Sequence, residues 1–453
     1  MTTLVWFRND LRLADNPALF DACADTNEDV IAGYLVAAEQ QREHGEGDRR
    51  LGFLRQNLEL LRTALADLRI PLWVASAPRF EDAAPALLAI ARSMGARALY
   101  FNAEYPLNEA RRDQSVLRAC ATIGMVCHAR HGDVIMPPGT VVKDDDEPYR
   151  VFTPFKRRWQ QRCSDSERVP LPVPAPRSAV PDISVPTADS LEDLPQMPAD
   201  PDWPAGEAAA RQRLDTFLEA RIHHYESDRD YPARKGTSRL SPYLAMGVLS
   251  ARDAFHHAEK TGAAAASWLS ELIWREFYRH IVSLYPHVSR GDSFRRELDG
   301  LPWRHDPEGL AAWKAGQTGY PLVDAGMREL AETGFMHNRV RMITAMFLTK
   351  HLLVHWREGE RHFMQHLRDG DFASNNGGWQ WSASTGTDAA PYFRVFNPES
   401  QAKKFDKDNE YIHRYVPELG TPSYPAPIVE HSSARQRALD FFKADKPPVT
   451  GAG

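Results

Sequence analysis

The chain has 453 residues, 43% hydrophobic and 26% charged, a composition that favours a globular protein of two domains over a disordered or fibrous one. Its formal net charge of −6 repels phosphate weakly, so a nucleic-acid partner would need a locally basic surface. Its four cysteines include no C-x-x-C pair, which argues against a disulfide framework or a zinc site and fits a reducing cytoplasm.

The first 135 residues alternate apolar runs with helical patterns. Segment 49–68 repeats leucine at helical spacing, and four apolar runs predict buried strands, at 3–8, 29–36, 70–76 and 97–104. This alternation predicts a doubly wound, Rossmann-like α/β domain over residues 1–135, with ligands near the carboxyl ends of its parallel strands. No glycine-rich dinucleotide or Walker sequence follows any of these runs.

The middle of the chain changes in composition. Between Ser164 and Pro204 there are ten prolines, many acidic residues and no periodicity, so we expect an interdomain connector within 136–204. Residues 205–453 are helical in pattern and predict a second, all-helical domain, with helices at 207–224, 267–285, 322–334 and 337–355. Because charged residues occur within the first ten positions and long apolar runs are lacking, we expect no signal peptide and no membrane span.

Segment 267–285 predicts a helix with two different faces. The face towards the core is expected to carry Leu269, Ile273, Phe277 and Leu284. The opposite face carries Glu271, Trp274, Arg275 and Tyr278. A flat aromatic wall beside a carboxylate and a cation suits a pair of nucleobases. A salt bridge between Glu271 and Arg275 beside a packed tryptophan is the alternative interpretation.

Three other segments carry clustered polar residues. HNRVRM (337–342) is either a solvated helix start or a set of donors for phosphate and carbonyl groups. GTSRLS (236–241) is either a serine-rich cap or a phosphate-binding turn at a helix start. DGDFASNNGGWQW (369–381) lacks the ligand pattern of a calcium loop, so we expect no metal there and infer a backbone close to a flat polar ligand.

These segments occur together, in this order, in one known family. The chain resembles the DNA photolyase/cryptochrome family, and within it the class I cyclobutane pyrimidine dimer photolyases. The resemblance rests on residues 6–19, 271–280, 314–330, 335–345, 375–398 and 424–431. Departures from the family pattern are Phe335 in place of a tryptophan, Arg290 in place of a lysine, and a shortened segment between Leu419 and Tyr424.

The resemblance implies two chromophores. FAD would lie in the helical domain, where Arg341 would pair with Asp369 and Asn375 would face flavin N5 and favour the reduced or semiquinone forms. The implied FAD-binding residues are Tyr225, Thr237, Ser238, Arg239, Leu240, Ser241, Arg341, Asp369, Gly370, Asp371 and Asn375. Asn108 and Glu109, with His44, match a pattern that binds an antenna, 5,10-methenyltetrahydrofolate, with a deazaflavin as the alternative.

The resemblance also implies the reaction. An electron from photoexcited FADH⁻ would enter a pyrimidine dimer flipped out of duplex DNA and return to the flavin after the two ring bonds break. Glu271 and Asn375 would act at this centre, and Trp303, Trp356 and Trp379 would carry electrons to the flavin during photoactivation. The implied substrate contacts are Glu271, Trp274, Arg275, Asn338, Arg339, Met342, Trp381 and Gln401. We expect a cytoplasmic monomer that binds no membrane.

Several positions separate the branches of the family. The (6-4) branch carries histidines at the positions of Asn338 and Met342, and the plant-type photoreceptors carry an acid at the position of Asn375. These differences favour repair of cyclobutane dimers in duplex DNA. The alternatives are a cryptochrome-type blue-light photoreceptor with little repair activity and a flavin-free helical DNA-binding module.

Overall fold

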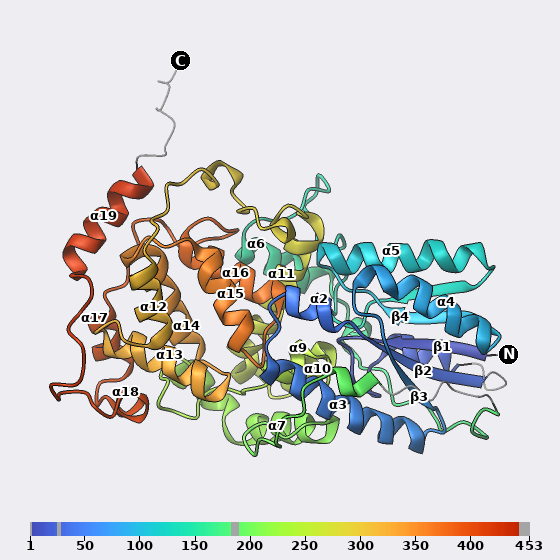
Figure 1. The fold of residues 1–453 in the computed structure, drawn as a ribbon. Coiled ribbons are helices and arrows are strands. Elements are labelled where there is room, and N and C mark those ends of the chain that lie inside the picture. The colour runs from blue at the N-terminus through green and yellow to red at the C-terminus, as the bar shows by residue number, and fades with distance from the viewer. Residues whose placement is uncertain (1, 25–28, 183–189, 444–453) are drawn as a thin grey trace. The chain divides into compact units, whose positions relative to one another are not determined.

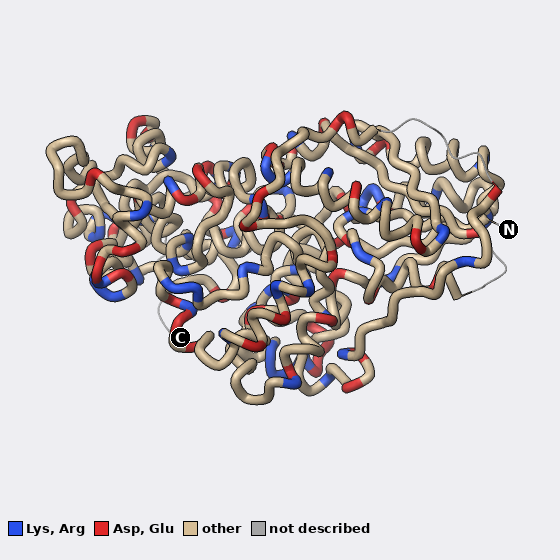
Figure 2. The backbone as a smooth tube through the Cα atoms, turned by 90° about the horizontal axis from the view of Figure 1, so that it is seen from below, with Lys and Arg blue, Asp and Glu red and all other residues tan. Residues whose placement is uncertain are grey.

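A computed structural model describes residues 2–24, 29–182 and 190–443 (Figure 1). The chain forms two compact units. The N-terminal unit comprises Met1–His223, Ser238–Pro286 and Arg368–Gly370, and the C-terminal unit comprises His224–Thr237, His287–Leu367 and Asp371–Gly453. Lysine and arginine are interspersed with aspartate and glutamate along both units (Figure 2). None of the helices in the described residues is long and apolar enough to cross a membrane.

The N-terminal unit is built on a parallel sheet of five strands in the order β3-β2-β1-β4-β5. The strands are β1 (Thr2–Phe7), β2 (Asp29–Val36), β3 (Leu72–Ser76), β4 (Ala96–Asn102) and β5 (Val126–Arg130). All residues of β1 are buried, as expected for a strand at the centre of a sheet covered on both faces. The helices that alternate with the strands are α1 (Pro17–Ala22), α2 (Ala38–Glu43), α3 (Asp48–Asp67), α4 (Ala83–Ser93) and α5 (Leu107–Thr122) (Figure 1).

Further helices complete the N-terminal unit. They are α6 (Phe152–Arg162), α7 (Glu207–Ala220), α9 (Ser241–Ala245), α10 (Ala251–Glu259) and α11 (Ala266–Leu284). α6 lies inside segment 136–204, where we predict a connector, and it packs on α11 through Phe155 and Phe277, whose ring centroids are 5.1 Å apart. Residues 183–189 of the same segment lie outside the described residues.

α11 confirms the helix predicted at 267–285 and corrects its core stripe. Ile273 and Phe277 are buried as predicted, but Leu269 and Leu284 are only half-buried. The buried surface of α11 is wider than an amphipathic stripe and includes Glu276, whose carboxylate accepts hydrogen bonds from Ile135 N, from Met136 N at 3.2 Å and from Trp159 Nε1 at 2.6 Å. This carboxylate accepts hydrogen bonds from a loop and from α6. The hydrophobic pattern of α11 alone does not reveal that a glutamate is buried in this role.

In its described residues the C-terminal unit is helical. Its α-helices are α8 (Tyr225–Asp228), α12 (Pro307–Ala315), α13 (Pro321–Thr333), α14 (Asn338–Met346), α15 (Trp356–His366), α16 (Phe372–Ala383), α17 (Pro398–Phe405), α18 (Glu410–Tyr415) and α19 (His431–Lys443). The helix predicted over 337–355 ends earlier: α14 continues into a π-helical turn (Phe347–His351), and the chain leaves it at Leu353, whose φ of 55° lies in the left-handed region.

Candidate active site

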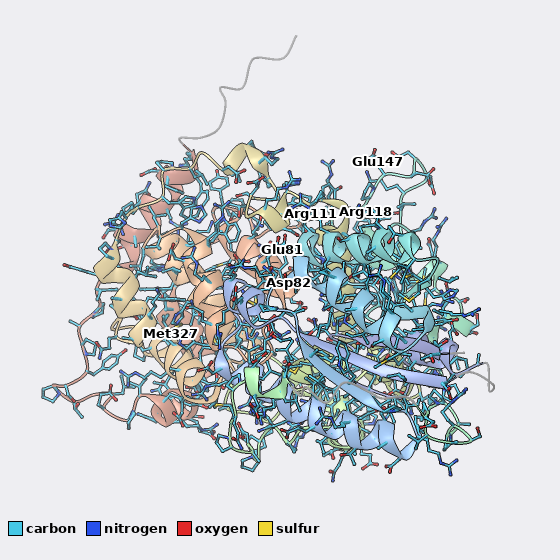
Figure 3. The ribbon with its side chains drawn as sticks, turned by 45° about the vertical axis from the view of Figure 1, so that its right-hand side comes forward. Glu81, Asp82, Arg111, Arg118, Glu147 and Met327 are labelled. Atoms are coloured by element: carbon cyan, nitrogen blue, oxygen red, sulfur yellow. The ribbon has the colours of Figure 1, made fainter. Side chains whose placement is uncertain are left out.

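His44, Asn108 and Glu109 lie together in the N-terminal unit, as their match to an antenna pattern predicts. Asn108 Nδ2 is 3.1 Å from His44 Nε2, and His44 Nδ1 is 3.6 Å from Glu109 Oε1. Asn108 and Glu109 stand in the first turn of α5. Arg111 and Arg118 project from the exposed side of the same helix (Figure 3), whereas Arg112 is buried beneath it.

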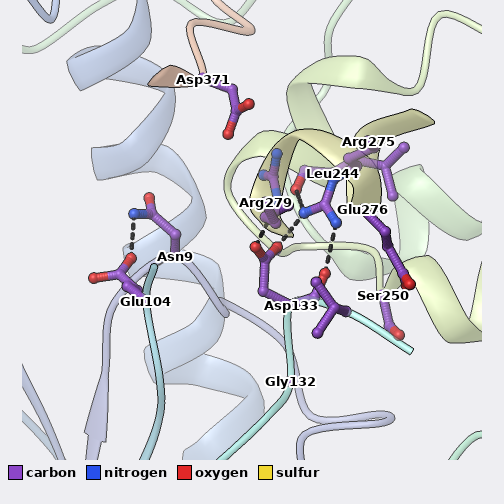
Figure 4. Close-up of polar contacts among 12 residues, drawn as sticks. Asn9, Glu104, Gly132, Asp133, Leu244, Ser250, Arg275, Glu276, Arg279 and Asp371 are labelled. Carbon is purple, nitrogen blue, oxygen red and sulfur yellow. Dashed lines mark hydrogen bonds and ion pairs between the residues drawn. The ribbon is translucent and has the colours of Figure 1, made fainter. Parts of the chain in front are cut away.

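Two carboxylates of this cluster have opposite pKa shifts. Burial raises the pKa of Glu109 to about 7, and the nearby charge of Glu104 adds to the rise. Burial acts on Glu104 as well, but Arg112 and Arg8 overcome it and lower the Glu104 pKa to about 2. Glu104 accepts a hydrogen bond from Arg112 at 2.6 Å. It accepts a second one from Asn9, also at 2.6 Å (Figure 4). The arginines therefore hold Glu104 ionised, while Glu109 can keep its proton near neutral pH.

We expect Glu109→Gln to stabilise the N-terminal unit at pH 8 but not at pH 5. Because the folded protein holds the Glu109 proton more tightly than the unfolded chain, its stability falls as pH rises from 4.5 towards about 7. Glutamine removes that loss, which amounts to at most about 3.4 kcal/mol at 1.36 kcal/mol per pKa unit. Guanidinium unfolding of antenna-free protein at both pH values measures the difference. Glu104→Gln is the matched control: its low folded pKa predicts destabilisation at pH 8. An equal effect of Glu109→Gln at both pH values would contradict the assignment.

The predicted substrate residues of α11 are held by neighbours in the N-terminal unit. Trp274 stacks on Phe152 with ring centroids 3.7 Å apart and 12° between the planes. Arg275 donates to the backbone oxygens of Asp133 at 2.5 Å and Leu244 at 3.1 Å and pairs with the Asp133 carboxylate, which Arg279 Nε also contacts at 2.7 Å (Figure 4). Phe152 and Asp133 thus fix the aromatic ring and the guanidinium, two groups that the sequence presents only as residues on one face of a helix.

The turn predicted to lie near phosphates precedes a helix, as expected. Ser241 begins α9, and Leu240 before it is buried. Ser238 Oγ accepts a hydrogen bond from Trp268 Nε1 at 3.3 Å. Arg239 has a φ of 53°, and its guanidinium lies 4.5 Å from the ring centroid of Trp203. A non-glycine residue with positive φ is uncommon and marks a sharp turn of the backbone.

The remaining predicted FAD-binding residues divide between the units. In the N-terminal unit, Asp369 is buried and Gly370 O accepts a hydrogen bond from Arg50 Nε at 2.8 Å. In the C-terminal unit, Tyr225 is buried, Thr237 is half-buried, and Arg341 Nε donates to Met336 O at 2.7 Å.

The start of α16 positions the polar residues of segment 369–381. Asp371 caps the helix, because its Oδ1 accepts a hydrogen bond from Ser374 N at 2.8 Å. Asn375 Nδ2 donates to Glu360 O at 3.0 Å, and Asn376 Nδ2 donates to Glu360 Oε1 at 2.8 Å. Asn375 turns its amide nitrogen towards Glu360. The side-chain oxygen of Asn375, Oδ1, can therefore accept a hydrogen bond from a ligand.

Glu360 contacts Asn375 and Asn376, and no motif in the sequence points to it. Burial raises its pKa to about 7, against the hydrogen bond from Asn376. The side chain is on α15, and only the fold brings it beside Asn375 and Asn376, which are on α16. Its sequence context, WREGERHF, contains several charged residues and gives no signal that this one is partly withdrawn from solvent.

The three tryptophans predicted to carry electrons belong to the C-terminal unit. Trp356 and Trp379 are buried, and within the described residues neither indole nitrogen has a hydrogen-bond partner. Trp303 is half-buried, and its ring centroid is 5.3 Å from that of His355, which is 5.6 Å from Trp356. Buried N–H groups without partners are rare in proteins, so hydrogen bonding does not explain why tryptophan stands at positions 356 and 379.

The predicted DNA contacts of the C-terminal unit are at least partly accessible. Asn338 is exposed at the first position of α14, and Arg339 Nη2 lies 2.7 Å from Asp230 Oδ2 and over the ring of Phe405. The other three predicted contacts are half-buried: Met342, Trp381 and Gln401.

Comparison with known proteins assigns the family. Residues 3–177 match the model described as "DNA photolyase", and residues 268–423 match the model described as "FAD binding domain of DNA photolyase". The chain is 43% identical to the deoxyribodipyrimidine photo-lyase of Escherichia coli K12 over 98% of its own length and 99% of that protein. It belongs to the DNA photolyase family.

Solved structures of this family share the fold. The class III photolyase of Agrobacterium tumefaciens superposes with a TM-score of 0.89 at 34% identity, covering 98% of this chain and 97% of that one. The cryptochrome of Synechocystis sp. PCC6803 superposes with a TM-score of 0.88 at 28% identity, covering 97% and 99%. The predicted fold class, an α/β parallel-sheet domain followed by an all-helical FAD-binding domain, is therefore confirmed. The boundaries 1–135, 136–204 and 205–453 stay predictions.

Proposed function

We propose that this photolyase-family chain is a deoxyribodipyrimidine photolyase that uses light to split cyclobutane pyrimidine dimers in duplex DNA. Its similarity to the enzyme of Escherichia coli extends over nearly the whole of both chains, which supports the same activity. The observation that carries the proposal is the orientation of Asn375, one N–H of which donates to the backbone oxygen of Glu360. A neutral amide that offers its oxygen suits the protonated N5 of a reduced flavin, the form that can donate an electron.

The side chains present fit FAD. Polar groups such as the buried Asp369 and the half-buried Glu360, whose carboxyl accepts from Asn376, suit a polar ligand rather than a solid apolar core. We propose that FAD is held by Tyr225, Thr237, Ser238, Arg239, Leu240, Ser241, Arg341, Asp369, Gly370, Asp371 and Asn375. When bound and reduced, FAD supplies the light-excited electron donor.

The protein's own part is to hold the lesion and exclude water. A dimer is already distorted, so flipping it out of the duplex costs less than flipping a paired base. We propose Trp274 and Trp381 as the flat walls for its rings, Glu271 as the hydrogen-bonding group for its polar edge, and Asn338 and Arg339 as contacts to the dimer and backbone. Phe152 behind Trp274 keeps the first wall from turning away. Arg275, Met342 and Gln401 complete the proposed contacts.

The test of this function is repair in vitro. Purified protein with chemically reduced FAD should restore intact thymines in a duplex oligonucleotide with one cyclobutane dimer, under blue light and not in the dark. Chromatography of the oligonucleotide measures the product. A flavin-containing protein without light-dependent repair would instead support the alternative, a cryptochrome-type blue-light photoreceptor; the chain is also similar to the cryptochrome of Synechocystis.

We expect Glu271→Ala to lower the repair yield more than the affinity for damaged DNA. In our proposal the carboxyl group contacts the flipped lesion and not the phosphate backbone, so its loss should reduce repair about tenfold, which corresponds to about 1.4 kcal/mol. Affinity should change less, because phosphate contacts dominate it. Repair yield and dissociation constant are measured on the same oligonucleotide, with Glu271→Gln as the matched variant that keeps the shape. Equal losses in both quantities would assign Glu271 to binding instead.

The antenna, the cellular site and the oligomeric state complete the proposal. The cluster of His44, Asn108 and Glu109 supports 5,10-methenyltetrahydrofolate as the antenna, with a deazaflavin as the second candidate. The absorption spectrum of the native protein and of its extracted chromophores distinguishes them.

We further propose a monomer in the cytoplasm, which suits the four cysteines, none of which forms a disulfide. Sedimentation measures the oligomeric state.

A further inference from the structure

Gly359 lies within α15 and contacts the side chain of Trp379. A Cβ atom at position 359 would lie 2.0 Å from Cη2, 2.4 Å from Cζ3 and 2.6 Å from Cζ2 of that indole. Glycine inside a helix costs about 0.5–1 kcal/mol relative to alanine, so its presence needs a reason outside the helix. The reason here is space: the six-membered ring of Trp379 occupies the position of a side chain at residue 359.

Packing alone orients the Trp379 ring. The side chain is 2% exposed, and within the described residues its Nε1 has no hydrogen-bond partner. The ring meets Phe363 edge-on with centroids 4.9 Å apart and Trp313 edge-on with centroids 5.9 Å apart. Gly359 and Phe363 are four residues apart on α15 and therefore lie on one face of that helix. They form a notch, the α15 notch, that receives the indole.

The α15 notch also sets where Trp379 lies relative to Trp356. Trp356 is the first residue of α15, three positions before Gly359. Residues three apart on a helix are surface neighbours, with Cβ atoms about 5–6 Å apart. A ring seated against Gly359 therefore lies beside the helical turn that carries Trp356. A side chain at position 359 would push the ring away from this turn.

We propose that Gly359 is a positioning residue for electron transfer from Trp356 to Trp379, an inference that rests on the proposed role of these tryptophans in photoactivation. After Trp379 has given an electron to the light-excited oxidised flavin, one electron passes from the Trp356 indole to the Trp379 radical cation. No bond or proton changes place in this step. Because electron tunnelling weakens steeply with the separation of the rings, the missing side chain at Gly359 keeps the step fast.

Gly359→Ala in FAD-loaded protein is the test. Light-driven reduction of the bound oxidised FAD should fall about tenfold, less than the hundredfold that a 1 Å misplacement can cost at a reacting centre. Repair per bound flavin, measured after chemical reduction of the FAD, should stay within about twofold of the wild-type value. Chemical reduction makes electron transfer through the tryptophans unnecessary, so that step cannot limit repair. The near-UV circular dichroism of the flavin-free variant should also change in the tryptophan band.

Three further variants make every outcome decisive. Gly326→Ala crowds a buried helix in the same unit, with a Cβ 2.3 Å from Val340 Cγ1, and should leave photoreduction per flavin unchanged. Trp379→Phe should block photoreduction; if it does not, the proposed electron relay itself is wrong. If Trp379→Phe blocks it while Gly359→Ala photoreduces at the wild-type rate, the role of Gly359 is overturned. Phe363→Leu removes the aromatic ring on the other side of the α15 notch and should also slow photoreduction. This variant tests the proposal if Gly359→Ala does not fold.

Discussion

Trp303→Phe is expected to slow light-driven reduction of oxidised FAD about tenfold or more, equivalent to about 1.4 kcal/mol of activation free energy per factor of ten. In the proposed relay Trp303 is the accessible end, because Trp356 and Trp379 are buried and cannot meet a reductant from solution. Phenylalanine is much harder to oxidise than tryptophan, so the electron should return from the flavin to the buried tryptophans. Absorbance of the flavin under blue light, with a thiol as reductant, measures the rate.

Trp313→Phe is the matched control for this result. Trp313 also contacts Trp379, with centroids 5.9 Å apart, but it is fully buried and its Nε1 donates to Thr344 O at 3.0 Å. It offers no outlet to solvent, so photoreduction should continue in this variant. Chemically reduced Trp303→Phe should repair dimers as the wild type does. Loss of that repair would show that Trp303 acts in the structure or in repair rather than in electron supply.

Glu276→Ala should lower the free energy of unfolding of the N-terminal unit by about 4 kcal/mol, in the range expected when a buried polar network loses one partner. The carboxylate is 1% exposed and accepts from the backbone of Ile135 and Met136 and from Trp159. Alanine would leave three donors without an acceptor in a place that water does not reach. Guanidinium unfolding followed by far-UV circular dichroism measures the loss.

Glu276→Gln keeps the size of the side chain and one acceptor oxygen, so it should cost clearly less than Glu276→Ala. Its amide N–H₂ would face donors, which prevents full rescue. A loss below about 1 kcal/mol in Glu276→Ala, within the usual range of a single net hydrogen bond, would mean that the loop at Ile135 rearranges to satisfy its own backbone.

Strand and helix positions were predictable where the apolar residues follow a single spacing, either that of a strand or that of a helix. The apolar runs behind β1 to β4 and the helices at α7, α11 and α13 follow directly from hydrophobic spacing. β5 was missed, because VCHAR is short, carries two polar residues and begins with a valine that is 55% exposed on an edge strand. The helix over 337–355 was predicted too long, because its pattern continues through a π-helical turn that spacing cannot reveal.

The candidate site was predictable as a set of residue types rather than as a set of contacts. Motifs identified Asn375 and Arg275, but Glu360 and Asp133, which hold them, come from segments far away in sequence. A partner brought by the fold leaves no mark on the local pattern of either residue. Gly359 shows the same limit, since a glycine in a helix looks unfavourable until the ring of Trp379 is placed against it.

His355 stands between two of the proposed electron carriers, and its cap on α15 fixes its charge. Its Nδ1 accepts a hydrogen bond from Arg357 N at 3.2 Å, which requires an unprotonated nitrogen, and burial lowers the imidazole pKa to about 4. Around neutral pH the ring between Trp303 and Trp356 therefore carries no charge. A positive hole that migrates outward to the surface therefore meets no charge on this imidazole, and the cation beside its path is Arg357, whose guanidinium lies 5.5 Å from the ring centroid of Trp356.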